Sequence, residues 1–199
     1  MTKPTPCDAL VATIRQCHLC QGLPLGPKPI LQASSNARIL IAGQAPGQVT
    51  HQRGRPFDDA SGERLRRWLA VDKETFYDPN QFAIVPMGFC YPGKATAGDA
   101  APRPECAATW RQPLLAALPN IELTLLLGRF AIAWHLANTE FAKQPLAQLT
   151  THWQQLWPQL MVLPHPSPRN NRWLAQHPQF EAQQLPRLQQ RIASLLHRH

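Results

Sequence analysis

The sequence predicts an α/β fold of three layers, α/β/α, in which a short, mostly parallel sheet of four strands lies between helices. The first observation is a set of four short apolar runs, each followed by a glycine or proline, at residues 38–42, 82–87, 121–127 and 160–163. The second is that segments with helical spacing of apolar residues separate these runs. Because strands and helices alternate along the chain, parallel strands with helices on both faces are favoured.

The first half of the chain supplies two of the strands. Residues 38–42, Arg-Ile-Leu-Ile-Ala, stop at Gly43 and are typical of a buried strand that leads into a loop. A helix is expected over 61–71, where apolar side chains follow helical spacing behind the cap residue Ser61. The second apolar run, 82–87, is the next expected strand.

The second half continues the alternation. A helix is expected over 105–118, and Pro113 is expected to kink or split it. The strand over 121–127 is closed by Gly128. The remaining expected elements are a helix over 129–137, a helix over 146–157, a strand over 160–163, and a mostly helical end over 172–196 that breaks near Pro178 and Pro186.

The composition narrows the class of protein. Lys and Arg number 20 against 12 Asp and Glu, and a balance this basic indicates a polyanionic partner. The sequence shows neither an apolar run of membrane-spanning length nor a secretion signal, so we expect a cytoplasmic protein without a membrane partner. We expect a monomer with one domain over 1–199, whose residues 1–35 form an N-terminal helix and arm. Residues 92–104, rich in Gly and Pro, are expected to form one long functional loop.

Polar loops rich in Gly and Pro follow the first and fourth expected strands. The first loop reads Gly43-Gln-Ala-Pro-Gly47 and continues through 54–62 as Gly-Arg-Pro-Phe-Asp-Asp-Ala-Ser-Gly, and the second reads His165-Pro-Ser-Pro-Arg-Asn170. Ligands of parallel α/β sheets bind beyond the carboxyl ends of the strands. We therefore expect the functional site in the loops after the first, second and fourth strands.

These loops, in this order and at this separation, resemble those of the uracil-DNA glycosylase superfamily. The resemblance extends over residues 10–195 and includes the Gly-Arg-Pro-Phe segment at 54–57, Leu127-Gly-Arg-x-Ala131 and the motif that begins at His165. It implies a short parallel sheet between helices. It also implies a DNA glycosylase of base excision repair that flips out uracil or a related deaminated base and hydrolyses its N-glycosidic bond. The implied partner is DNA with a damaged or deaminated base, and the implied location is the nucleoid.

The cysteines sharpen this resemblance. Cys17 and Cys20 form a C-x-x-C motif, and Cys90 and Cys106 form a wider pair. Thiolates suit iron–sulfur clusters or zinc, and in a cytosolic chain such cysteines are more typical of ligands than of disulfides. The arrangement resembles the iron–sulfur branch of the superfamily, families four and five. It implies a structural [4Fe–4S] cluster held by these four thiolates, with zinc as the alternative and Cys7 as a surplus thiol.

Hydrolysis of an N-glycosidic bond makes the sugar cation-like and the leaving base anionic, after the nucleotide has been flipped out of the stack. The site therefore needs a group that stabilises the anion and a group that handles water. By resemblance, His165 stabilises the base anion and Phe57 stacks on the base. Asp59 handles the water, with Asp58 as the alternative, although either carboxylate could instead serve as a helix N-terminal charge. Gln44, or its backbone, orients the base.

The chain departs from the superfamily pattern at two places. Gln44 and Ala45 stand where relatives often carry a carboxylate or Asn, and neither can act as a base. Residues 85–89, Val-Pro-Met-Gly-Phe, stand where most relatives carry an Asn that reads uracil. Ala45, Met87 and Asn170 are placed at the base, whose identity stays open between uracil and other deaminated or damaged bases. A catalytically silent DNA- or base-binding sensor or scaffold is the alternative function, and an enzyme acting on a small nucleotide is the third.

The loop Pro168-Arg-Asn170 resembles that of single-strand-selective glycosylases, which pushes into the DNA stack. Ser167, Arg169 and Arg55 are expected to contact DNA. Further candidates for backbone contact are Arg53, Arg103, Arg129 and Arg172, whereas the stripe of Arg64, Arg66 and Arg67 is read as a solvated helix face.

Overall fold

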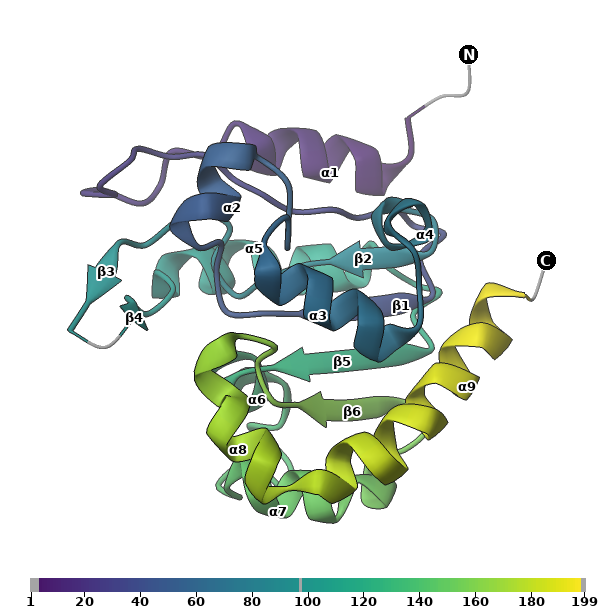
Figure 1. The fold of residues 1–199 in the computed structure, drawn as a ribbon. Helices are drawn as coiled ribbons and strands as arrows, with labels where there is room; N and C mark the ends of the chain where they lie inside the picture. The colour runs from purple at the N-terminus through teal and green to yellow at the C-terminus, as the bar shows by residue number, and fades with distance from the viewer. Residues whose placement is uncertain (1–3, 97, 198–199) are drawn as a thin grey trace.

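A computed structural model describes residues 4–96 and 98–197, and a four-stranded sheet forms its centre (Figure 1). The expected domain of residues 1–199 also includes residues 1–3, 97 and 198–199, which lie outside the described residues. The strand order is β2–β1–β5–β6, and every neighbouring pair is parallel. This sheet, flanked by helices, confirms the predicted α/β fold. Its strands are β1 (Ile39–Ala42), β2 (Phe82–Ile84), β5 (Leu123–Leu127) and β6 (Leu160–Leu163).

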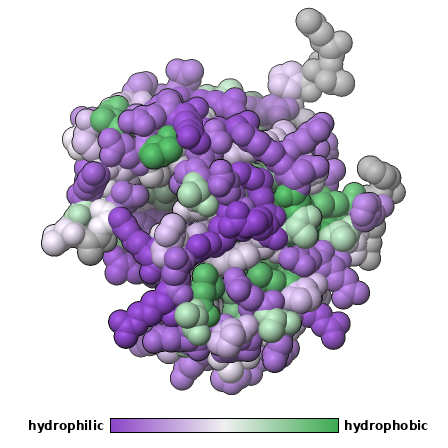
Figure 2. Space-filling model, in the orientation of Figure 1, coloured by the Kyte–Doolittle hydropathy of each residue, from purple (hydrophilic) through white to green (hydrophobic). Residues whose placement is uncertain are grey.

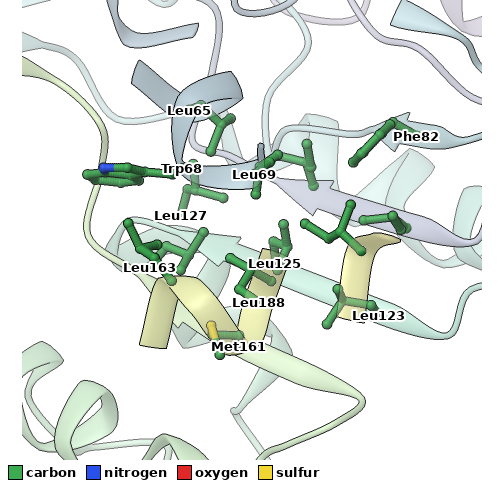
Figure 3. Packing of buried hydrophobic residues seen from close by; sticks show 14 of the residues in the cluster. Leu65, Trp68, Leu69, Phe82, Leu123, Leu125, Leu127, Met161, Leu163 and Leu188 are labelled. Atoms are coloured by element: carbon green, nitrogen blue, oxygen red, sulfur yellow. The ribbon is translucent and has the colours of Figure 1, made fainter. Parts of the chain in front are cut away.

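One face of the sheet is covered by α3 (Ala60–Leu69), α4 (Lys73–Tyr77) and α9 (Leu185–Leu196). Because successive strand residues point to opposite faces, Ile39 and Ile41 of β1 enter this layer together. Figure 3 shows side chains of α3 and α9 meeting those of β5 and β6 there. Each fully buried Leu or Ile in such a layer contributes about 1.5–3 kcal/mol to folding.

The other face is covered by helices from three parts of the chain. Leu40 and Ala83 pack against α1 (Pro6–Arg15) and α5 (Pro104–Ala116). Leu126 and Val162 pack against α6 (Arg129–His135) and α7 (Leu146–Thr151). The presence of α1 agrees with the expected N-terminal helix, and its first turn is fixed by a capping box. Both faces of the sheet are thus buried, which explains why the strands read as continuous apolar runs.

β2 is shorter than the apolar run 82–87 predicts, because it ends at Ile84. Pairing with the β1 segment nevertheless continues, because the N–H groups of Val85 and Met87 donate to the carbonyl oxygens of Ile41 and Gly43, each at 2.9 Å. Arg111 also binds this stretch, because its Nη1 donates to the carbonyl oxygens of Val85 at 2.6 Å and Pro86 at 3.3 Å. The segment after Ile84 therefore stays attached to its neighbour up to the carboxyl edge of the sheet.

Two expected helices differ from the structure. α5 runs unbroken through Pro113. This proline lies in the last turn of the helix, which ends at Ala116. The segment 146–157 divides into α7 and a 3₁₀ turn, Trp153–Gln155.

The C-terminal segment 172–196 is confirmed as mostly helical. It consists of α8 (Asn171–Gln176), a π-helical turn (Phe180–Gln184) and α9. The chain leaves the helix just before Pro178, as predicted. No break occurs at Pro186, because it is the second residue of α9, where a missing N–H leaves no intrahelical bond unmade.

The loops at the carboxyl ends of the strands gather at one edge of the molecule (Figure 1). α2 (Gln48–Arg53) follows β1 there, and the expected long loop of 92–104 carries a small antiparallel ribbon of β3 (Lys94–Ala95) and β4 (Gly98–Asp99). The face seen in Figure 2 is mostly hydrophilic. Among the described residues, no helix has the length and apolar character needed to cross a membrane.

Candidate functional site

The loops at the carboxyl edge enclose a cavity of about 640 Å³, which lies within the usual size range of ligand pockets. It is lined by the loops that follow β1, β2 and β6, in agreement with the expected position of the site. Nine of the residues predicted from the sequence line this one cavity: Gln44, Ala45, Phe57, Asp59, Arg129, His165, Ser167, Arg169 and Asn170.

His165 presents a neutral hydrogen-bond donor to this cavity. The backbone N–H of Ser167 donates to its Nδ1 at 3.2 Å, so Nδ1 is an acceptor and the ring proton sits on Nε2. Burial lowers the pKa of His165 most strongly, and the positive charge of Arg169 lowers it further, against the opposing effect of nearby carboxylates. The neutral imidazole is therefore favoured at neutral pH, with its Nε2–H available to a ligand.

The loop that carries His165 is held by three hydrogen bonds. Asn170 Nδ2 donates to the His165 carbonyl oxygen at 2.7 Å, and Ser167 Oγ accepts the backbone N–H of Arg169 at 3.2 Å. Arg64 Nη1 donates to the Ser167 carbonyl oxygen at 3.3 Å, so this arginine is half-buried and bonded where the sequence analysis expects a solvated face. The Asn170 amide is thus engaged in shaping the loop as well as lining the cavity.

The structure separates the two neighbouring aspartates. Asp59 caps α3, because its Oδ1 accepts the N–H of Gly62 at 2.9 Å, and its carboxylate lines the cavity. Its Oδ2 makes no hydrogen bond to any described residue. Asp58 lies outside the cavity wall, where it pairs with Arg55 at 3.2 Å and Arg53 at 3.8 Å. The geometry therefore favours Asp59 as the candidate for handling water.

Phe57 is held against the cavity in an unusual backbone conformation. Its φ is +52°, in the left-handed region that a bulky residue rarely adopts. A Cβ on Gly62 would stand 1.7 Å from the Phe57 carbonyl oxygen, and one on Gly43 would stand 3.4 Å from its ring. Glycine at 62 thus lets α3 press against the Phe57 backbone, and such strain at a cavity wall is typical of a functional position.

Two predicted residues lie elsewhere. Met87 is 5% exposed and packs in the apolar cluster beneath α6, while the neighbouring Pro86 lines the cavity in its place. Arg55 lies outside the lining and stacks over the ring of Tyr77 at 4.0 Å from its centroid. Within the first motif, Gln44 Nε2 donates to the Ala100 carbonyl oxygen at 3.3 Å, which ties the loop after β1 to the end of the β3–β4 ribbon.

Sequence reasoning missed Asp99 and Thr50, which also line the cavity. The only signal for Asp99 is its position in the expected functional loop of 92–104. Arg169 lies against the same ribbon, because a Cβ on Gly98 would stand 2.1 Å from its Nη1. The ribbon and the loop after β6 thus meet across the mouth of the cavity.

A second, smaller cavity collects the four cysteines that the sequence analysis singles out: Cys17, Cys20, Cys90 and Cys106. Within residues 4–96 and 98–197, no three His, Cys, Asp or Glu side chains converge closely enough to hold a single metal ion. The thiols therefore surround a space without meeting at one point.

N–H groups point at these sulfurs. Trp110 Nε1 donates to Cys17 Sγ and the backbone N–H of Phe89 donates to Cys106 Sγ, each at 3.3 Å. Burial raises the pKa of the Cys106 thiol to about 12. Cys7 is buried in the cluster between α1 and α5 and does not line this cavity.

Two arginines lie beside the cysteine cavity. Arg103 is half-buried and lines it, and its Nε is buried without a hydrogen-bond partner among the described residues. Arg111 is 1% exposed, lies near Cys106, and pairs with no carboxylate among the described residues. Its Nη2 meets His135 Nε2. A buried guanidinium without a carboxylate is costly, so this region is suited to hold an anionic group.

A model of the uracil DNA glycosylase superfamily matches residues 31–189 of the chain. This range contains the whole four-stranded sheet and, apart from Ile30, every residue that lines the larger cavity.

Proposed function

The chain belongs to the uracil-DNA glycosylase superfamily, and from this premise we propose that it is a DNA glycosylase that hydrolyses the N-glycosidic bond of uracil or a related deaminated base. One observation carries the proposal: a neutral His165 and the carboxylate of Asp59 face the same cavity. These are the two kinds of group that this hydrolysis requires.

His165 serves the leaving base. As the bond to the sugar breaks, negative charge develops on the carbonyl oxygens of the base, and a fixed hydrogen-bond donor stabilises that charge. The Ser167 N–H holds the imidazole with its Nε2–H directed away from the loop. A neutral donor suits this role because it stabilises the anion without first losing or gaining a proton.

Asp59 serves the sugar side of the bond. Gly62 fixes one carboxylate oxygen, and the other is free to accept a proton from water or to face the cation-like sugar. Phe57 supplies a flat apolar surface, and its strained backbone keeps the ring at the cavity wall, where a flipped base would stack. The chain has 20 Lys and Arg against 12 Asp and Glu, and this excess of positive charge suits a DNA partner.

The second cavity supports a further part of the proposal, a [4Fe–4S] cluster held by Cys17, Cys20, Cys90 and Cys106. The four thiols surround one space, N–H groups point at two of them, and unpaired arginine nitrogens lie beside it. A cluster with several iron atoms suits thiols that surround a space better than one zinc ion does. When bound, it would link the N-terminal arm to α5 as a structural cross-link. This feature is the basis for placing the chain near the iron–sulfur branch.

Excision of uracil from an oligonucleotide tests the proposal. We expect His165→Ala to lower single-turnover excision by about 10²–10³-fold, as loss of one oxyanion donor does elsewhere, while salt-dependent DNA binding persists. Gln44 and Ala45 provide no catalytic base, which favours the alternative of a catalytically silent sensor or scaffold. If wild-type protein binds DNA but releases no nucleobase under any condition, this alternative replaces the glycosylase.

A further inference from the structure

Asp99 brings a second carboxylate to the larger cavity from outside the recognised motifs. It belongs to β4, which pairs with Lys94–Ala95 of β3 in the ribbon after β2. The residue is exposed, and its Oδ2 lies 3.3 Å from the position that a Cβ on Gly47 would occupy, so the carboxylate lies beside the loop after β1. Its side chain lines the cavity and makes no hydrogen bond or ion pair with any residue that the structure describes.

Asp99 and His165 face the same ligand space. Both side chains line the larger cavity, and the charges of Asp59 and Asp99 oppose the lowering of the His165 pKa by burial. They differ in hydrogen-bond character, because a neutral imidazole offers its Nε2–H as a donor and an ionised carboxylate only accepts. The cavity therefore presents a donor and an acceptor to whatever binds between them.

A donor and an acceptor that face one cavity match one feature of nucleobase chemistry. Deamination of cytosine or adenine replaces an amino group by a carbonyl and converts the adjacent ring nitrogen from an acceptor into an N–H donor. The product carries a lactam, a carbonyl beside an N–H. A carboxylate accepts a hydrogen bond from that N–H, whereas it meets the lone pair of the unmodified ring nitrogen with repulsion.

Other groups at the cavity are less suited to this reading. The backbone after β2 offers Pro86, which has no N–H, and the side chain of Met87 turns into the core. The amide of Gln44 is bonded to the Ala100 carbonyl, and one oxygen of Asp59 caps α3. Of the two carboxylates that line the cavity, Asp99 is the one that accepts no hydrogen bond from any described residue.

We propose that Asp99 is the residue that selects the base, by accepting the lactam N–H of a deaminated base while His165 donates to its carbonyl oxygen. The inference rests on the proposed function and names its substrate class: bases with a lactam edge, such as uracil and hypoxanthine, in preference to cytosine and adenine. It assigns Asp99 to specificity, and Asp59 keeps the handling of water.

A binding experiment tests this reading without requiring catalysis. Titration calorimetry with the full chain compares 1-methyluracil, which keeps the N3–H, with 1,3-dimethyluracil, which lacks it. We expect the first to bind about 10- to 100-fold more tightly in the wild type, as for a hydrogen bond to a charged acceptor. Asp99→Asn should lose most of this preference, whereas Thr96→Ala, at an exposed position of the same ribbon, should retain it.

Excision assays complete the test. In Asp99→Asn, we expect the ratio of the uracil release rate to the cytosine release rate, measured on matched oligonucleotides, to fall. Circular dichroism should show that the fold is intact. Equal binding of the two methylated bases by the wild type, or a preference that survives in Asp99→Asn, overturns the inference. A slower chemical step in Asp99→Asn with the preference intact also overturns it and makes Asp99 part of water handling. If the preference depends on Asp99 but no base is released from DNA, the inference stands and the proposed glycosylase activity fails.

Discussion

Replacing Asp59 by Asn separates the two roles that this residue occupies. Asn caps helices about as well as Asp, so the hydrogen bond from the Gly62 N–H to the side chain, 2.9 Å in the native protein, is kept. Only the charge at the start of α3 is lost, which costs about 0.3–1 kcal/mol of stability. Because an amide can neither take a proton from water nor stabilise a cationic sugar, we expect excision to fall by about 10²–10⁴-fold.

The assay is single-turnover release of uracil from an oligonucleotide, measured beside urea unfolding of the same preparation. Asp72→Asn is the matched control, because Asp72 caps α4 in the same way, accepting the N–H of Thr75 at 2.7 Å, and does not line the cavity. We expect that variant to keep wild-type activity. Full activity in Asp59→Asn would refute the reasoning and leave Asp59 as a helix cap alone.

Three other predictions concern stability and the second cavity. Burial, with the neighbouring Arg111 cation, lowers the pKa of His135 to about 3 from 6.5, so the unfolded chain takes up the proton first as the pH falls. Through this group, the free energy of unfolding in urea should fall by about 2 kcal/mol between pH 7 and pH 5. His135→Gln should make the free energy of unfolding less dependent on pH, and an unchanged pH dependence would contradict a buried, neutral His135 beside Arg111. Gly62→Ala should lower the free energy of unfolding by about 1–3 kcal/mol and slow excision, because the new Cβ would collide with the Phe57 carbonyl oxygen. Unchanged stability and activity would show that α3 does not press against the Phe57 backbone. Cys106→Ser should purify under anaerobic conditions with less iron and sulfide than Cys7→Ser; equal contents would remove Cys106 from the cluster.

The sequence predicts the sheet well because its strands are buried on both faces. Residues 38–42, 121–127 and 160–163 read as continuous apolar runs, and each contains a strand in the structure. The second strand ends at Ile84, before the apolar run does, and no local pattern reveals that Arg111 donates to the carbonyl oxygens that follow. Short helices such as α2 and α4 are also not predicted from the sequence, because five or six residues are too few to show helical periodicity.

The sequence predicts those parts of the candidate site that come directly after a strand. The carboxyl ends of parallel strands meet at one edge, so the loops containing Gln44 and His165 had to come together. Arg64 and Asp99 could not be placed in this way. The partner of Arg64 is a carbonyl more than a hundred residues further along the chain, and Asp99 reaches the cavity only because the 92–104 segment folds into a ribbon. The start of α3 separates Asp58 from Asp59, whose sequence context is nearly identical, because Asp59 caps the helix at the cavity and Asp58 pairs with Arg55.

The most direct test of the central claim is identification of the base released from single- and double-stranded oligonucleotides that each carry one uracil, hypoxanthine, xanthine, oxidised pyrimidine or cytosine. The wild-type protein, purified without oxygen, is expected to release uracil or another deaminated base and to leave cytosine in place, and His165→Ala is expected to lose this activity. Failure to release any base, from folded protein that still binds DNA, would contradict the glycosylase account.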